Sequence, residues 1–165
     1  MQRSAVLPVV LSLALAAPAA FSAELGCIGG YNFRQGGTEI DTTHYRLRNF
    51  NHHRTLSVTA ITVYAFDGTT LFSLLPGSFP PGFNAVLGPH QTTGLELEDL
   101  FGNNQAPNNF VQTVITWEAD RGHGGFERLD VTAARITRAR NAATGDQGQT
   151  RARAIVRCRE LRSER

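Results

Sequence analysis

Lysine is absent from the 165-residue chain, and all 16 of its basic side chains are arginine. Arginine without lysine is typical of a GC-rich genome, so we expect a bacterial source. Beyond the N-terminal segment, no run of apolar residues is long enough to cross a membrane as a helix. No window of helix length shows an apolar period of 3.6 residues, which argues against a mainly helical protein.

Cysteine is limited to Cys27 and Cys158, close to the two ends of the chain. An oxidising compartment lets such a pair close, and we predict a disulfide bond between them. In the chain-entropy model, a closed loop of roughly 130 residues stabilises the fold by about 4–5 kcal/mol. The alternative is a lipid anchor on Cys27. Glu24 and Leu25 fit a lipidation box poorly, however, and the lipid would leave Cys158 without a partner.

The N-terminal segment combines a positive charge at Arg3 with an apolar run at residues 5–17 and small residues up to Ala23. This pattern is typical of an export signal, and the run is too short for a stable membrane anchor. We therefore predict a signal peptide at residues 1–23 and one mature domain at residues 24–165. The mature protein is expected in the periplasm or secreted, with no transmembrane segment after cleavage.

Short runs of alternating apolar and polar residues, broken by Gly, Pro and Asn, make up the rest of the chain. This pattern predicts strands, and we expect an all-β, two-layer β-sandwich of immunoglobulin-like or fibronectin type III-like topology. A small β-barrel is the alternative, because alternation does not determine how a sheet closes. The predicted strands are 38–49, 56–66, 69–75, 91–100, 110–118, one or two within 126–138, and 150–161.

Several strands carry more detailed predictions. Tyr45 and Leu47 should face the core, and Trp117 should be buried because its large apolar area is worth more inside. Asp67 and Gly68 should form a two-residue hairpin turn. The last strand should have one basic and one apolar face, the apolar face comprising Ala152, Ala154, Val156 and Cys158.

A catalytic signature is missing from the sequence. No serine lies in a nucleophile-elbow context, and a disulfide would leave no free thiolate. Glu96, Glu98 and Asp99 could supply an acid and a base for glycoside cleavage. However, Glu96 and Glu98 are two apart on a predicted strand, where carboxylates are ordinarily solvated or paired with arginine. We therefore predict no enzymatic activity and no cofactor.

Adjacent histidines, His52 and His53, lie in a predicted loop at residues 49–54. Such a pair can bind a transition metal if other ligands approach, but a structural zinc site normally needs about four ligands. His44 and His90 lie in other segments, so the sequence does not bring them together. We predict no metal site, and keep a metal-binding protein or metal-dependent enzyme using the loop histidines as an alternative function.

Positive charge is concentrated near the C-terminus, where residues 134–165 hold nine arginines and three acidic residues. If the last strand shares a sheet with strand 38–49, the two would form a cationic face suited to an anionic polysaccharide or an envelope protein. The simpler interpretation is that these arginines pair with Glu96 and Glu98. We expect no nucleic-acid partner, because the basic strand lacks interleaved aromatics. The candidate anion-binding face comprises Arg46, Arg48, Arg151, Arg153, Arg157 and Arg159.

Aromatic residues in or next to the proline-rich connection at residues 76–88 form a second candidate surface. Phe72, Phe79 and Phe83 would mark a partner surface if they were exposed together. Taken with the missing catalytic signature, the sequence predicts an exported binding or structural module of unknown partner. A further alternative is an accessory or adhesive subunit, which would present an open sheet edge or an aromatic patch.

Overall fold

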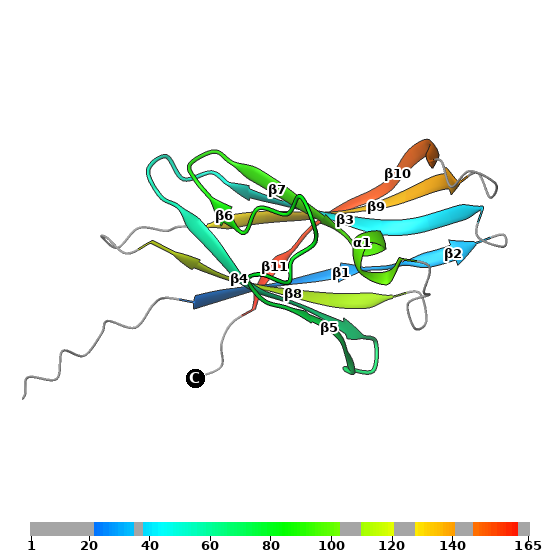
Figure 1. Ribbon diagram of the computed structural model, residues 1–165, viewed down its shortest axis with the longest axis horizontal. Coiled ribbons are helices and arrows are strands. Elements are labelled where there is room, and N and C mark those ends of the chain that lie inside the picture. The colour runs from blue at the N-terminus through cyan, green and yellow to red at the C-terminus, as the bar shows by residue number, and fades with distance from the viewer. Residues whose placement is uncertain (1–21, 35–37, 103–109, 121–127, 141–146, 162–165) are drawn as a thin grey trace, which may run out of the picture.

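The computed structural model describes residues 22–34, 38–102, 110–120, 128–140 and 147–161, with side chains at all of these positions except 33–34, 140 and 147–153 (Figure 1). These residues form two antiparallel sheets that pack against each other, and no closed barrel forms among them. The predicted all-β sandwich is confirmed. The predicted signal peptide lies outside the described residues, apart from Ser22 and Ala23, which begin the first strand.

Sheet A contains β1 (Ser22–Gly29), β4 (Leu56–Ala65), β5 (Thr70–Leu74), β6 (Val86–Leu87), β8 (Val111–Ala119) and β11 (Arg159–Leu161). Its strands lie in the order β11-β1-β8-β4-β5, and β6 pairs with the N-terminal end of β4. The central strands β4 and β8 are rich in the β-branched and aromatic residues that fit a pleated, half-buried surface.

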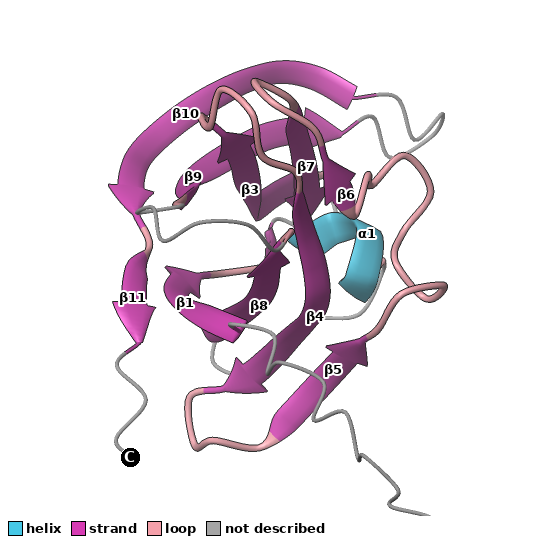
Figure 2. Cartoon of the chain, turned by 90° about the vertical axis from the view of Figure 1, so that its left-hand side faces the viewer, coloured by secondary structure: helices cyan, strands magenta, loops and turns pink. Residues whose placement is uncertain are grey.

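Sheet B contains β2 (Asn32–Arg34), β3 (Glu39–Asn49), β7 (Thr92–Glu96), β9 (Leu129–Arg140) and β10 (Gln147–Arg157). Its order is β10-β9-β3-β2, and β7 also pairs with β3. Since β9 pairs with β3 along its whole length, β2 and β7 follow one another along the opposite edge. Figure 2 shows the two sheets as separate layers, with a short helix, α1 (Leu97–Phe101), at one open side.

The core lies between the inner faces of the two sheets. Tyr45, Leu47 and Trp117 are all buried there, as predicted from their alternation. The Tyr45 hydroxyl accepts a hydrogen bond of 2.9 Å from Thr113 Oγ1 of the opposite sheet, and burial raises the pKa of this phenol. A Cβ atom at Gly29 would overlap the same hydroxyl, so this position requires glycine.

Two turn regions differ from the predictions. The β4–β5 hairpin forms, but its loop has three residues, Phe66, Asp67 and Gly68. Ala65 and Thr69 are the pair that closes the loop. Gly68 takes the left-handed conformation, with φ of 86°. The prediction of a single strand at 91–100 is also wrong: β7 ends at residue 96 and α1 follows.

Among the described residues, no helix has both the length and the apolar character that a membrane crossing requires.

The predicted last strand is two strands that belong to different sheets. β10 ends in sheet B, the Cys158 amide donates to the Val131 carbonyl at 2.9 Å, and β11 continues in sheet A beside β1. Val156 pairs with the buried Ala133, which in turn pairs with the core residue Tyr45, so Val156 lies on the inner face as predicted, although 58% of it is exposed. The exposure is explained by the position of β10 at the edge of sheet B, and a register shift between Ala152 and Ala154 interrupts its pairing with β9.

The predicted disulfide bond between Cys27 and Cys158 is present, with their Cα atoms 4.6 Å apart. Cys27 lies on β1 of sheet A, and Cys158 lies where the chain crosses from sheet B to sheet A. The bond therefore fastens this crossing to the body of the sandwich. It also uses the Cys27 sulfur atom that a lipid anchor would need.

Candidate functional site

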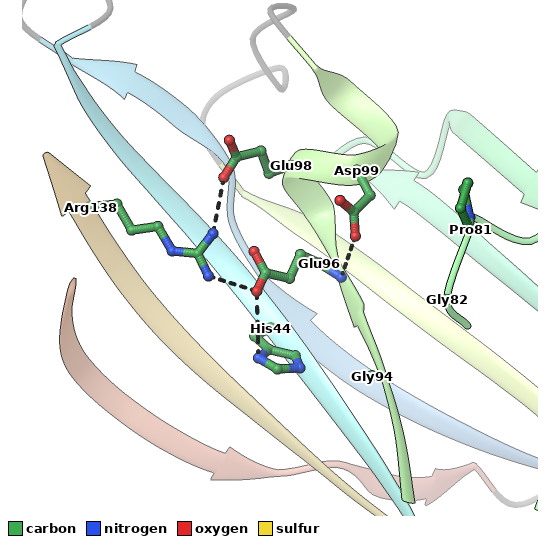
Figure 3. Close-up of a pocket in the computed structure, with 8 residues that line it drawn as sticks. All are labelled: His44, Pro81, Gly82, Gly94, Glu96, Glu98, Asp99 and Arg138. Carbon is green, nitrogen blue, oxygen red and sulfur yellow. Dashed lines mark hydrogen bonds and ion pairs between the residues drawn. The ribbon is translucent and has the colours of Figure 1, made fainter. Parts of the chain in front are cut away.

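A polar cleft of about 470 Å³ lies on the face of sheet B turned away from the core, next to the start of α1 (Figure 3). Its position follows from the alternation of β3, in which Tyr45 points inward and its neighbour His44 outward. The cleft is lined by His44, Pro81, Gly82, Gly94, Glu96, Glu98, Asp99 and Arg138.

Arg138 on β9 holds two of the carboxylates. Its guanidinium donates to Glu96 Oε1 at 2.7 Å and to Glu98 Oε2 at 3.4 Å. Partial burial lowers the pKa of Arg138, but the hydrogen bond that it donates to Glu96 and the attraction of the acidic groups outweigh this effect, so the pKa is raised. The guanidinium thus remains charged and fixes both carboxylates at the cleft wall.

His44 lies directly opposite Glu96 in the β3–β7 register, and its Nδ1 is 3.7 Å from Glu96 Oε1. The imidazole also packs over Gly94, where a Cβ atom would overlap its Nε2. Burial lowers the pKa of His44, and the charges of Arg46 and Arg138 add to this effect. The charges of Glu96 and Asp99 oppose it but do not reverse it.

Replacing His44 by asparagine should flatten the pH dependence of stability just below pH 6.5. Because the folded-state pKa of His44 lies below its ordinary value of 6.5, the unfolded chain binds more protons in that window. The free energy of unfolding should therefore decrease as the pH falls through it, and should decrease less in His44→Asn. Urea unfolding at several pH values measures both slopes, and equal slopes would show that His44 titrates as it does in the unfolded chain.

Helix α1 positions Glu98 and Asp99 at the cleft. Its buried side chains, Leu97 and Phe101, are four residues apart and so lie on one face of the helix. The Glu98 amide donates to Thr42 Oγ1 on β3 at 3.1 Å, which ties the first turn to sheet B. The acidic residues of that turn are consequently left facing the cleft.

The charges of the cleft lining do not cancel. Glu96, Glu98 and Asp99 carry three negative charges and Arg138 one positive charge, while the lowered pKa of His44 keeps its imidazole neutral at pH 7. Such a surface attracts amino or guanidinium groups and can accept hydrogen bonds from hydroxyls. In the described part of the chain, no group of three or more His, Cys, Asp or Glu side chains is arranged to hold a metal ion.

The structure brings together only part of the candidate anion-binding face. Arg46 and Arg157 lie in one row of sheet B, on either side of Thr132, and both are exposed. Arg48 is opposite the acidic Asp130, and Arg159 belongs to sheet A. The side chains of Arg151 and Arg153 lie outside the described residues, although their backbone belongs to β10.

The three phenylalanines of the candidate partner surface are each partly buried against the core. Phe79 and Phe83 are neighbours, with ring centres 4.9 Å apart. Phe72 instead meets the edge of Phe101, with ring centres also 4.9 Å apart. Much of the apolar surface of these residues is therefore used within the domain.

The loop histidines have a third companion. The ring centres of His52 and His53 are 6.2 Å apart, and His90 lies closer to His52, at 4.8 Å. All three residues are exposed. The sequence could not bring His90 to this loop, because 36 residues separate it from His53.

Arg138 is the cleft residue that the sequence analysis missed. The association of Glu96, Glu98 and His44 with Arg138 depends on the register of β3 with β7 and β9. Alternation predicts which face a residue occupies and not which residue lies opposite, so this register is not visible in the pattern.

The fold and cleft define this chain as an all-β sandwich with a polar, net-negative cleft on one outer face. Comparisons with models of protein families, with curated proteins and with solved structures found no match.

Proposed function

We propose that this chain is a non-enzymatic, extracytoplasmic binding module, and that the cleft around Arg138 is where its partner binds. The disulfide bond supports an oxidising compartment such as the periplasm or the extracellular space. The leader-like N-terminal segment supports export. Together they favour a protein of the cell envelope or a secreted protein.

The observation that carries the binding role is the clustering of Glu96, Glu98, Asp99 and Arg138 at one concave site. The cleft is largely open to solvent, and its volume of about 470 Å³ is sufficient for a small ligand or one unit of a larger one. Because the guanidinium already engages Glu96 and Glu98, these carboxylates are held in position as acceptors. Binding needs such fixed acceptors, and no serine, threonine or cysteine is part of the cleft lining.

The ligand that fits best is a cationic group, as in an amino sugar, which also bears hydroxyls, or in a basic side chain of a partner protein. The net negative lining disfavours an anion in this position. A hydroxyl could bond to the carboxylate oxygens not used by Arg138, since each ionised carboxylate accepts about four hydrogen bonds.

A soluble oligomer of deacetylated amino sugar tests this proposal. The native protein should bind it, and Glu96→Gln with Glu98→Gln should weaken binding by about tenfold, since charge-assisted hydrogen bonds contribute about 1.5–3 kcal/mol. Calorimetric titration measures both affinities. Glu118→Gln on β8, in the other sheet, is the matched control and should bind as the native protein does.

Two results would count against the cleft as the binding site: no binding of the oligomer, or equal losses of affinity in the control and the double variant.

A second candidate function, binding of a polyanion, is favoured by the row formed by Arg46 and Arg157. Heparin retention distinguishes it, because Arg46→Gln with Arg157→Gln should weaken retention on heparin and should not weaken oligomer binding.

An immunoglobulin-like classification is part of the proposal. In that fold, strands B and E pair in one sheet and strands C and F in the other. We assign β3 and β7 to strands B and E, and β4 and β8 to strands C and F, because each pair is antiparallel within one sheet. β5 follows β4 at the sheet edge. Under this assignment β1, and not the last strand of the chain, lies beside the F-like strand β8.

A further inference from the structure

We propose that His52 and His90 together bind one divalent late transition metal ion, such as Zn²⁺, Ni²⁺ or Cu²⁺, with water completing its coordination. Neutral imidazole is a good ligand for these metals. The two residues lie on separate loops at the end of β3 away from α1, so this site is distinct from the cleft. Figure 1 shows the two loops side by side.

The spacing of the two rings suits a shared ion. With metal–nitrogen bonds of about 2.1 Å and a ligand angle between square-planar and tetrahedral, two imidazole centres on one metal lie roughly 4.5–5.2 Å apart. The His52 and His90 ring centres are 4.8 Å apart. His53, at 6.2 Å from His52, falls outside this range and is not a ligand.

The backbone at His90 gives independent support. His90 has φ of 61°, and no other described residue except glycine has a positive φ. It follows Pro89 in a turn closed by the Gln91 amide and the Gly88 carbonyl at 3.1 Å. Glycine or asparagine is ordinarily favoured at this position of such a turn, and a histidine here is uncommon. A ligand role for its side chain explains that choice.

One buried side chain fixes the relative position of both loops. Asn49 Nδ2 donates to the Arg54 carbonyl at 2.7 Å, in the loop that carries His52. The same amide donates to the Leu87 and Gly88 carbonyls at 2.8 and 3.0 Å, where the turn with His90 begins. The two loops that carry the ligands are thus held together before a metal arrives, which lowers the entropic cost of binding.

Titration of the oxidised full chain, carrying no polyhistidine tag, with Zn²⁺ alone and with Cu²⁺ alone tests the site. One ion should bind per chain, and His52→Asn or His90→Asn should weaken binding by at least about tenfold. Asparagine tolerates a positive φ, so His90→Asn preserves the turn. His53→Asn is the matched control and should change the affinity by less than about twofold.

Imidazole ¹⁵N spectra of the native protein locate the ion without any variant. Zn²⁺ should shift the ring nitrogens of His52 and His90, and should leave those of His44 and His53 unchanged. The proposal is overturned if no saturable binding occurs, if His53→Asn weakens binding as much as His52→Asn, or if the shifts fall on other histidines. In each of these cases the His52–His90 contact is an aromatic contact only. The cleft proposal is unaffected by any of these outcomes, because its probe and variants are different.

Discussion

Reduction of the Cys27–Cys158 bond should lower the free energy of unfolding by about 5 kcal/mol. The bond joins residues 131 positions apart, and the chain-entropy model assigns about this much to the freedom that the unfolded chain regains. Native stability is usually about 5–15 kcal/mol, so reduction removes a large part of it. Guanidinium unfolding of the oxidised and reduced protein measures the difference.

The control for this experiment is the variant Cys27→Ala with Cys158→Ala. It should unfold at the midpoint of the reduced native protein and should not respond to the reductant. A loss smaller than about 1 kcal/mol on reduction would mean that the crossing between β10 and β11 is held by its packing and hydrogen bonds alone.

Replacing Asn49 by alanine should lower the free energy of unfolding by about 3 kcal/mol. Asn49 is 1% exposed, and its side-chain amide donates to three backbone carbonyls. Alanine leaves these carbonyls without that donor, and each buried unsatisfied polar group costs about 1–3 kcal/mol. Urea unfolding of the oxidised protein measures the change.

Asn84→Ala is the matched control for Asn49→Ala. Asn84 is exposed, and its carbonyl oxygen accepts one bond of 3.1 Å from the Val86 amide, so its loss should cost less than about 1 kcal/mol. If both variants lose the same amount, the hydrogen bonds of Asn49 do not stabilise the fold beyond an ordinary turn contact.

The alternation of apolar residues was sufficient to predict the sandwich. Tyr45 and Leu47 share a face because successive residues of a strand point to opposite sides, and both are buried. Even where β7 gives way to α1, Leu95 and Leu97 are buried while Glu96 and Glu98 remain at the surface. Polarity therefore predicted the burial of these residues although the predicted backbone conformation was wrong.

The two N-terminal strands were not predicted. β1 begins at Ser22, and although Leu25, Cys27 and Gly29 are buried in alternation, its glycines and the exposed Ile28 obscure that pattern in the sequence. Its stability comes from pairing with β8 and β11, which are distant in sequence. Tertiary contacts of this kind override local propensity and leave no local signal.

The polar sites depend on the same long-range pairing. Arg138 meets Glu96 because both β9 and β7 pair with β3, and His90 meets His52 because Asn49 ties their loops together. A buried polar pair provides a further example: Thr137 Oγ1 donates to Asp41 at 2.5 Å inside sheet B. The sequence identified the chemical groups, and the register of the sheet decides which of them meet.

Site-specific photocrosslinking in intact cells tests most directly whether the cleft is the binding site. A photoreactive residue at position 81, where an exposed proline lines the cleft, should give a discrete crosslinked product. The same residue at position 66, on the β4–β5 hairpin where the native phenylalanine is 83% exposed, should give none. Crosslinking from position 66 with none from position 81 would contradict the proposal that the partner binds in the cleft.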